Sequence, residues 1–514
     1  MTNTDATGIA PRDEPATGGD ERVELSADAA VELAVRLAGA SGLGRSSRAE
    51  RGRWLGAIAD AVEAHRDELV ALAGEETHLS AARLGGELTR TSTQLRFFAG
   101  VIDEGSYLEA TIDSPDASLL PPRPELRRML RPLGVVGVFA ASNFPFAFSV
   151  LGNDTASALA AGCPVVVKAH PGHPRLSRRV TEVAHEALAA AGGPAAALQL
   201  VEGMEAGLAL VQHPRVTAVG FTGSTRGGRA LFDLAAARPE PIPFYGELGS
   251  LNPVVVTPAA VSDAGPGAAS IAAGLAGSFT RDGGQYCTKP GLVFVPEGSG
   301  IEDALVAALG DAAPQRLLTE GIAAAFDRGS VELAERDDVD LVFAGERAAD
   351  VAAPVVVATS TESFVEGREA FLEECFGPLT LLVRYADDAG LGRALAVLEG
   401  SLTASIHHAP GEDVADLAEA LESVAGRLVF NGWPTGVAIA WGQHHGGGWP
   451  ATTASVHTSV GATAIRRWLT PVAWQDAPAA VLPAELADGN PLGVPRREDG
   501  VLVAAPTPHV SQDG

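Results

Sequence analysis

Cysteine is scarce in this chain of 514 residues, which contains only Cys163, Cys287 and Cys375. Three cysteines cannot form a disulfide framework, and the odd number leaves at least one thiol free, which favours a reducing compartment. The sequence also lacks an uninterrupted apolar run of the roughly 18 residues that a membrane-spanning helix needs. Its first residues have no apolar segment typical of a secretory signal. We therefore expect a cytoplasmic protein that does not span a membrane.

Positive charge is also in short supply. The 37 Lys and Arg residues face 64 Asp and Glu residues, which gives a formal net charge of −27. A surface that binds nucleic acid or an anionic membrane needs the opposite balance, so we expect neither partner. At 46% hydrophobic residues the chain can nevertheless bury a large core, and its length predicts two large domains or three ordinary ones.

Two series of short β-branched runs alternate with Ala-rich stretches of helical character. The first begins at Gly134 with GVVGVFA and PVVVKA, and the second begins near Gly291 with GLVFV, PVVVAT and LTLLVRY. Strands joined by crossover helices predict an α/β fold of two doubly wound, Rossmann-like units, with a seam at about 270–290. The ends, 1–22 and 484–514, are polar or rich in Pro and Gly, so we expect a disordered N-terminal segment and a poorly ordered tail.

Cys287 lies in the segment GGQYCTKPG at the predicted seam. A thiol on a loop between domains lies where ligands usually bind, and nearby Lys289 could favour its thiolate form. Most free cysteines are small buried apolar side chains, and position alone leaves both interpretations open. For Cys163 and Cys375 the buried, unreactive interpretation is favoured.

Glu247 lies in FYGELGSLNP, at the end of an apolar strand and flanked by glycines. Apolar surroundings should raise the pKa of a carboxylate toward the range useful to a general base, although a solvated turn glutamate is the alternative. Gly223 and Ser224 follow the strand VTAVGF and begin a helix, whose N-terminus suits a phosphate or simply carries an ordinary cap. No Gly-x-Gly-x-x-Gly fingerprint is present there.

Six motifs in this order resemble the aldehyde dehydrogenase superfamily over residues 25–475: ASNFP, VVVK, FTGST, ELGS, GQYC and EECFGP. KAHPGHP, the serine of ELGSLNP, CTKPGLV, FNGWPTGV, HGGGWPATT and RRWLTPVAWQDAP resemble the branch that oxidises 2-oxoglutarate semialdehyde (2,5-dioxopentanoate). The resemblance implies NAD(P)-dependent oxidation of a semialdehyde through a cysteine thiohemiacetal and thioester.

The resemblance also implies roles for single residues. Cys287 would attack the aldehyde, Asn143 would stabilise the oxyanion, and Glu247 would activate water. Expected cofactor contacts are Ser142, Lys168, His170, Gly223, Ser224, Glu374 and Phe376. Ser142 occupies a position where relatives commonly carry Trp.

The implied organisation is a cofactor-binding domain over 23–270 and a catalytic domain over 271–455. A small β oligomerisation arm would combine 125–133 with a return segment over 456–483, and would build a homodimer or homotetramer. We expect no metal.

NADP is expected at least as readily as NAD, because no carboxylate follows Lys168 in KAHPGHPR to repel a 2′-phosphate. His170, His173 and Arg175 could add attraction, or the histidines could merely cap a loop.

The expected substrate carries a distal carboxylate, for which Arg90, Arg96 and Lys289 are candidate partners. Six helical residues turn roughly 600°, so Arg90 and Arg96 point about 120° apart and at most one should bind substrate.

Three alternatives remain at this point. The first is an aldehyde dehydrogenase for another short or aliphatic aldehyde. The second is a non-redox cysteine acyl-transfer enzyme, which would need a histidine partner; His407 and His408 end a predicted strand, but nothing places them beside Cys287. The third is a catalytically silent protein of the same fold, against which the joint presence of Cys287, Glu247 and Asn143 argues.

Overall fold

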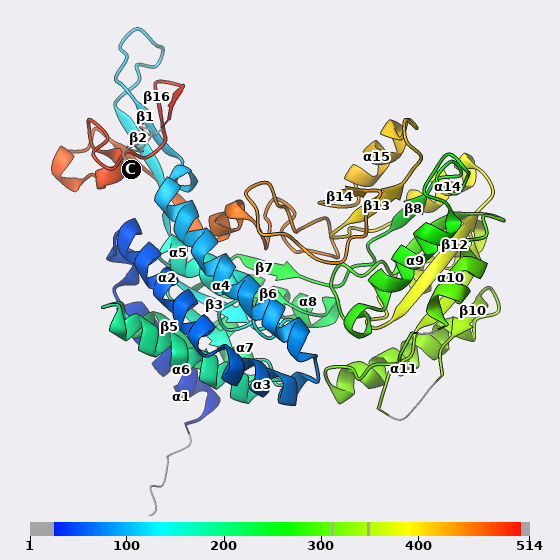
Figure 1. Ribbon diagram of the computed structural model, residues 1–514. Coiled ribbons are helices and arrows are strands. Elements are labelled where there is room, and N and C mark those ends of the chain that lie inside the picture. Colours follow the sequence, from blue (N-terminus) through cyan, green and yellow to red (C-terminus); the bar gives the residue numbers. More distant parts are fainter. Residues whose placement is uncertain (1–24, 311, 347–349, 505–514) are drawn as a thin grey trace, which may run out of the picture.

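The computed structural model describes residues 25–310, 312–346 and 350–504 (Figure 1). The N-terminal segment expected to be disordered, 1–22, lies outside these residues. Four helices lead into the first sheet: α1 (Ala27–Ala40), α2 (Arg48–Ala64), α3 (Arg66–Thr77) and α4 (Ala81–Glu104). No helix within the described ranges is both long and apolar enough to cross a membrane.

The first domain is built on a parallel five-stranded sheet in the order β5-β4-β3-β6-β7. Its strands are β3 (Val135–Phe139), β4 (Val165–Lys168), β5 (Leu198–Val201), β6 (Val216–Thr222) and β7 (Phe244–Glu247). The crossover helices are α5 (Asn153–Ala161), α6 (Pro174–Ala190), α7 (Met204–Gln212) and α8 (Thr225–Ala236). The chain winds outward from β3 in one direction and then from β6 in the other, so a ligand crevice is expected at the carboxyl ends of β3 and β6.

The second domain carries a seven-stranded sheet in the order β10-β11-β12-β9-β8-β13-β14, parallel except for β10. Its strands are β8 (Val254–Val256), β9 (Leu292–Pro296), β10 (Asp340–Ala344), β11 (Val355–Ser360), β12 (Leu379–Tyr385), β13 (Ala404–His407) and β14 (Leu428–Phe430). Its helices are α9 (Ala268–Phe279), α10 (Ile301–Leu309), α11 (Glu320–Ala334), α12 (Thr361–Glu366), α13 (Arg368–Phe371), α14 (Asp388–Leu395) and α15 (Ala415–Glu422). The predicted α/β class with two doubly wound units is confirmed.

The expected domain boundary at residue 270 is wrong, because β8 already belongs to the second sheet, where it pairs with β9 and β13. The first sheet ends with β7, so the chain passes between the domains within 248–253. The run that forms β8 is only three valines long, and α9 follows it before the next strand. A run this short does not stand out as a strand in the sequence.

A third sheet forms an arm that projects from the first domain (Figure 1). It has the order β15-β2-β1-β16-β17, with β1 (Ala110–Asp113), β2 (Leu126–Pro132), β15 (Leu469–Gln475), β16 (Arg496–Glu498) and β17 (Val501–Val503). β15 pairs with β2 along its whole length. The two segments that the family resemblance assigns to an arm therefore lie together.

The prediction of a poorly ordered tail from residue 484 is wrong for 484–504; residues 505–514 lie outside the described ranges. β16 pairs in parallel with β1, and β17 pairs with β16. Two apolar side chains of this segment, Leu486 and Val494, are fully buried, and Arg127 of β2 donates to the Leu486 carbonyl. A few buried anchors thus order a segment that has no periodic pattern of its own.

Candidate active site

The expected nucleophile and base meet between the two large sheets. Glu247 is the last residue of β7, and Cys287 follows the short turn η4 (Arg281–Gly284) that leads toward β9. His445 joins them from a loop after β14, and one ligand atom from each of the three residues lies within 4.8 Å of the others. Glycines in η4 adopt φ of +71° and +68°, at Gly283 and Gly284, a left-handed conformation that favours glycine.

Glu247 is 5% exposed and both of its carboxylate oxygens accept hydrogen bonds. His445 Nε2 donates to Oε1 at 2.7 Å, and Ser459 Oγ donates to Oε2 at 2.5 Å. Burial alone raises the pKa of Glu247, but His445 and Ser459 hold it below its ordinary value. The expectation of a raised pKa is therefore wrong, because sequence reasoning counted the apolar surroundings and missed both donors. Glu247 is ionised and ready to accept a proton.

The Cys287 thiol is half-buried, and its Sγ lies 3.6 Å from His445 Nε2. Burial and the Glu247 carboxylate raise the pKa of Cys287 well above its ordinary value, while the Arg427 guanidinium acts in the opposite direction. The resting group is therefore a thiol whose proton must be taken by a neighbouring base. Glu247, whose carboxylate interacts with this thiol and contacts the same His445 Nε2, is that neighbour.

Lys289 does not contribute to this site. Its side chain is 2% exposed, and Nζ donates to the carbonyls of Cys375 and Leu379, each at 2.9 Å. The predictions that Lys289 favours the thiolate and binds substrate are both wrong, because its ammonium donates to two backbone carbonyls inside the second domain instead. The cysteines at 163, 287 and 375 are all unpaired.

Asn143 lies on the loop after β3 and is 9% exposed. Its Nδ2 donates to the carbonyl of Gln285 at 3.0 Å. Gln285 is two residues before Cys287 in sequence, so this contact holds the Asn143 amide close to the nucleophile. Ser142, the preceding residue, is half-buried in the same loop. The structure thus brings Asn143, Glu247 and Cys287 together from three separate segments.

Of Arg90 and Arg96, the two arginines of α4 that were expected to contact substrate, only Arg90 faces the site. Burial lowers the pKa of Arg90, and the charges of Glu87, Cys287 and Glu247 oppose that shift. Its Nη1 donates to the Val437 carbonyl, while Nε and Nη2 are buried without a partner among the described residues. A buried guanidinium with free donors is a site for an anion.

Arg96 forms an ion pair with Asp60 of α2 at 2.5 Å, and its side chain is 46% exposed. The prediction that it contacts substrate is wrong, because the helical turn between positions 90 and 96 directs the two side chains to different faces.

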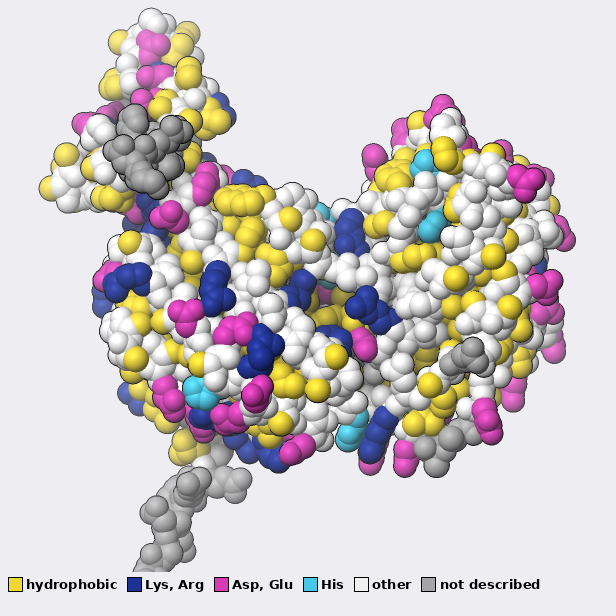
Figure 2. All heavy atoms as spheres, in the orientation of Figure 1, with side chains coloured by type: hydrophobic (Ala, Val, Ile, Leu, Met, Phe, Trp, Pro, Cys, Tyr) yellow, Lys and Arg dark blue, Asp and Glu magenta, His cyan; other side chains and the backbone are white. Residues whose placement is uncertain are grey.

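A further cation, Arg427, was missed by the sequence analysis. It donates to the carbonyls of Pro434 and Gly436 at 2.6 and 3.1 Å, which fixes the loop after β14, and its Nε is buried without a partner among the residues described. The Arg427 guanidinium lies close enough to Cys287 for their charges to interact, so it faces the candidate active site. On the face drawn in Figure 2, dark blue Lys and Arg side chains surround the depression between the two domains.

The expected cofactor contacts gather at the carboxyl ends of the first sheet. Lys168 ends β4 and is half-buried, and Ser224 caps α8 by accepting from the Gly227 amide at 3.2 Å. Gly223 continues β6 and donates its amide to the Glu247 carbonyl at 3.0 Å. No hydrogen bond or ion pair engages the Lys168 ammonium within the described part of the chain, so it is free for a ligand.

Glu374 and Phe376 approach the same crevice from the second domain, on the loop before β12. Burial raises the pKa of Glu374 to about 7, and the Lys289 ammonium opposes this shift. A methyl group added at Gly249 would come within 2.7 Å of Glu374 Oε2, so this carboxylate lies directly against the β7 loop. Phe376 is half-buried beside it.

The basic residues after Lys168 do not add free charge. Burial and the neighbouring His173 and Lys168 lower the pKa of His170 to about 3, so His170 is neutral, and its Nδ1 accepts from the Gly172 amide. His173 is buried with Nε2 against the Ala141 carbonyl at 3.0 Å.

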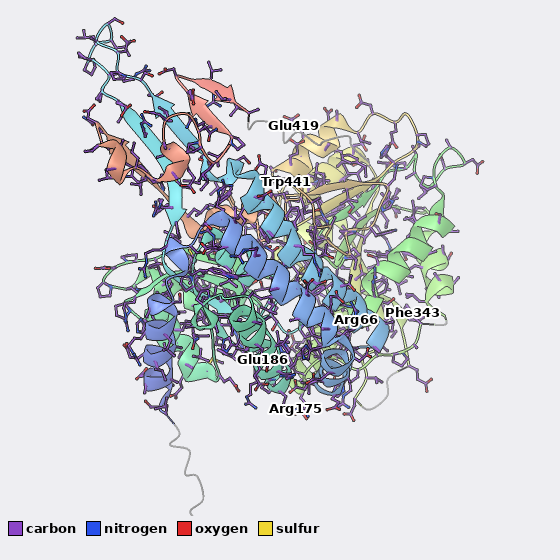
Figure 3. The ribbon with its side chains drawn as sticks, turned by 60° about the vertical axis from the view of Figure 1, so that its left-hand side comes forward. Arg66, Arg175, Glu186, Phe343, Glu419 and Trp441 are labelled. Carbon is purple, nitrogen blue, oxygen red and sulfur yellow. The ribbon has the colours of Figure 1, made fainter. Side chains whose placement is uncertain are left out.

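Arg175 is paired with Glu75 and Glu76 at the lower edge of the molecule (Figure 3). The contacts of His170 and His173 with backbone groups therefore match the interpretation that these histidines cap a loop.

His445 is another functional residue that the sequence analysis missed. It belongs to the HGGGWPATT motif, whereas the strand pattern pointed to His407 and His408, and His407 stacks against Trp433 at 4.5 Å between ring centroids. His445 is 1% exposed, and its Nδ1 is buried without a partner within the described residues. The three consecutive glycines that follow it were a signal: a Cβ at Gly446 or Gly447 would lie 2.7 or 2.1 Å from a backbone carbonyl oxygen.

The chain is similar in sequence to known aldehyde dehydrogenases. The chain is 46% identical over 462 residues to alpha-ketoglutaric semialdehyde dehydrogenase 2 of Azospirillum brasilense, covering 88% of this chain and 87% of the relative. It is 38% identical to alpha-ketoglutaric semialdehyde dehydrogenase of Acinetobacter baylyi, covering 89% of this chain and 88% of the relative.

Among solved structures, betaine aldehyde dehydrogenase of Staphylococcus aureus in complex with NAD⁺ superposes with a TM-score of 0.73 at 21% identity, covering 88% of this chain and 89% of that one. The sequence pattern described as the aldehyde dehydrogenase family matches residues 14–451. This chain therefore belongs to the aldehyde dehydrogenase family.

Proposed function

We propose that this protein oxidises 2-oxoglutarate semialdehyde to 2-oxoglutarate with NADP or NAD. The observation that carries the proposal is that Cys287, Glu247 and His445 lie within 4.8 Å of one another, near Arg90, which has free donors among the described residues. The names of the two relatives at 46% and 38% identity support the choice of aldehyde. Another short or aliphatic aldehyde is the alternative substrate.

In the first half-reaction, Glu247 takes the proton of the Cys287 thiol and Sγ forms a bond to the aldehyde carbon. The carbonyl oxygen becomes an oxyanion, which accepts hydrogen bonds from Asn143 Nδ2 and the Cys287 amide. A nicotinamide cofactor, when bound, supplies the two-electron oxidation that turns the thiohemiacetal into a thioester. Glu247 then releases the first proton to solvent. In the second half-reaction it takes a proton from a water molecule whose oxygen attacks the thioester carbon, the C–S bond breaks to release the acid, and this proton returns to Cys287 Sγ.

His445 and Ser459 position the base for both steps. Together they engage both oxygens of Glu247, which fixes the plane of its carboxylate beside Sγ. A hydrogen-bonded and ionised carboxylate keeps its accepting role at neutral pH, although it is buried.

The residues around the crevice fit a dinucleotide. The free Lys168 ammonium would contact the adenosine ribose or a 2′-phosphate, and the N-terminus of α8 at Gly223 and Ser224 would hold the pyrophosphate. Glu374 would bind the nicotinamide ribose, with Phe376 packed nearby.

A preference for NADP rests on Lys168, since His170 is neutral and Arg175 is already paired. Ser142 would lie near the nicotinamide, on the loop that carries Asn143.

We also propose that the arm makes the protein a homodimer or homotetramer. One side of the arm sheet ends in β15 and the other in β17, so each outer strand has an unpaired edge among the described residues of the single chain.

The first test uses the purified protein with 2-oxoglutarate semialdehyde and each cofactor, followed by the absorbance of reduced nicotinamide. We expect Cys287→Ser to abolish turnover, because a serine hydroxyl is far less acidic than a thiol. Cys163→Ser and Cys375→Ser are matched controls that should stay active. If aldehyde is consumed or a thioester hydrolysed without formation of reduced nicotinamide, the non-redox acyl-transfer alternative, which the nearby His445 makes chemically reasonable, replaces this proposal.

Glu247→Gln should lower kcat by about 100-fold or more, because an amide cannot take a proton from water. Solvent can still accept the thiol proton, so formation of the thioester is slowed less than its hydrolysis; the thioester then accumulates, and rapid mixing should show a burst of reduced cofactor before the slow steady state. Glu373→Gln, an exposed neighbour of Glu374, serves as the control and should behave as the wild type. Unchanged steady-state rates in Glu247→Gln would refute its role as the base.

Arg90→Met should lower kcat/KM for semialdehydes at least about 30-fold while leaving that for pentanal nearly unchanged, because a buried charge pair with the substrate acid is lost. Arg96→Met is the matched control on the same helix and should leave this selectivity intact. Equal kcat/KM values for pentanal and the semialdehydes in the wild type would contradict an acid-binding pocket at Arg90.

Lys168→Met should lower kcat/KM for NADP about tenfold more than for NAD, because the lost ammonium faces the extra phosphate. His170→Gln should change this ratio little, since His170 carries no charge. A wild-type kcat/KM for NAD more than about ten times that for NADP would contradict the proposed preference.

A further inference from the structure

The three residues at the reaction centre are also three metal ligands of different type. Cys287 offers a sulfur, His445 an imidazole nitrogen and Glu247 a carboxylate oxygen, all within 4.8 Å of one another. These are the donor types that Zn²⁺ prefers, usually in tetrahedral geometry. The thiol is half-buried rather than sealed, so a small ion can reach it from the crevice.

The distances come close to those of a tetrahedral site. Zn–S and Zn–N bonds of about 2.3 and 2.1 Å place sulfur and nitrogen about 3.6 Å apart, and Sγ and Nε2 are 3.6 Å apart here. The corresponding nitrogen–oxygen separation is about 3.4 Å, whereas Nε2 and Oε1 are 2.7 Å apart. An ion would therefore replace the His445–Glu247 hydrogen bond and move these two groups apart by less than an ångström.

The proton balance is also favourable. Nε2 carries the hydrogen that is donated to Glu247, and it must lose this hydrogen to bind a metal. Nδ1 of the same ring has no partner in the described structure and can carry it instead. The thiol releases its proton to solvent when the S–Zn bond forms, and Ser459 continues to support the other oxygen of Glu247.

We propose that Cys287, His445 and Glu247 bind Zn²⁺ in the resting protein, with water as the fourth ligand, and that the ion reversibly blocks aldehyde oxidation. The thiolate and the carboxylate together neutralise the ion's charge, while the guanidinium groups of Arg90 and Arg427 oppose it and favour release. This departs from the expectation that the chain holds no metal. The ion takes no part in the reaction, and only its inhibitory effect rests on the proposed function.

The test uses full-length protein treated with a chelator and then titrated with Co²⁺ or Zn²⁺ in the absence of aldehyde and cofactor. Co²⁺ in a tetrahedral site with a thiolate ligand should give intense visible bands and a sulfur-to-metal charge-transfer band. Zn²⁺ should displace it and should slow alkylation of Cys287 by iodoacetamide about tenfold or more, as counted by peptide mass spectrometry with the half-buried Cys375 as internal reference.

Variants identify the ligands. Cys287→Ser should remove the charge-transfer band, and His445→Gln should weaken binding of Co²⁺ by about 10- to 100-fold or more, since loss of even an outer-shell partner costs that much. His408→Gln, which makes the same change directly after β13, should bind as the wild type. Far-ultraviolet circular dichroism of each variant shows whether it is folded.

Absence of tetrahedral Co²⁺ bands in the wild type, or equal Co²⁺ binding by folded His445→Gln, would overturn the metal site and leave the proposed oxidation untouched. Metal binding in a protein that oxidises no aldehyde would instead overturn the proposed function alone.

Discussion

The burial of one carboxylate between two domains is the constraint on which the rest of the structure depends. An ionised Glu247 is tolerated away from water only because it accepts hydrogen bonds from both His445 and Ser459. Both donors come from a segment about 200 residues further along the chain. The loop between them must therefore return to the end of β7, and any change that frees this loop leaves a buried charge without partners.

Backbone hydrogen bonds hold that returning segment against β7 as if it were another strand. The Leu248 amide donates to the Ala451 carbonyl at 2.8 Å, and the Thr453 amide donates to the Gly246 carbonyl at 3.1 Å. The Thr453 hydroxyl also accepts from the Gly246 amide. Another buried carboxylate, Glu87, fixes a second loop of the site.

Glu87 lies on α4, in its second turn, and accepts from the amides of Phe146 and Ala147 at 2.8 and 2.9 Å. Its other oxygen pairs with Arg83, whose guanidinium lies over the Phe144 ring. These contacts fix the loop that carries Asn143. The helix that presents Arg90 to the crevice thus also holds the loop of Asn143, which links the proposed substrate contact to the proposed oxyanion contact.

Much of the fold could be predicted, because parallel strands buried on both faces leave β-branched runs that the sequence shows directly. The period of the α-helix likewise predicts that Arg90 and Arg96 point in different directions, since they lie six residues apart on one helix. Contacts between distant segments could not be predicted in this way. His445 lies 158 residues after Cys287, and no local pattern states which histidine returns to a given thiol.

The same limit explains the errors at Lys289 and in the C-terminal segment. Lys289 is two residues from the nucleophile in sequence, but its side chain turns toward the Cys375 and Leu379 carbonyls. Order in 484–504 depends on Leu486 and Val494 being buried against other parts of the chain. Sequence proximity and local composition carry little information about either outcome.

The thiol and the base belong to different sheets, since Glu247 ends β7 of the first domain and Cys287 precedes β9 of the second. Each domain is packed around its own core. The distance between the thiol and the carboxylate is therefore set by how the two domains are positioned, and not by the conformation of a single loop. A rigid-body shift of one domain by about an ångström would part Sγ from the carboxylate without disturbing either core. The reaction rate therefore depends on the relative position of the two domains. Substitutions at the domain interface, far from the thiol and the base, can change this rate while both domains stay folded.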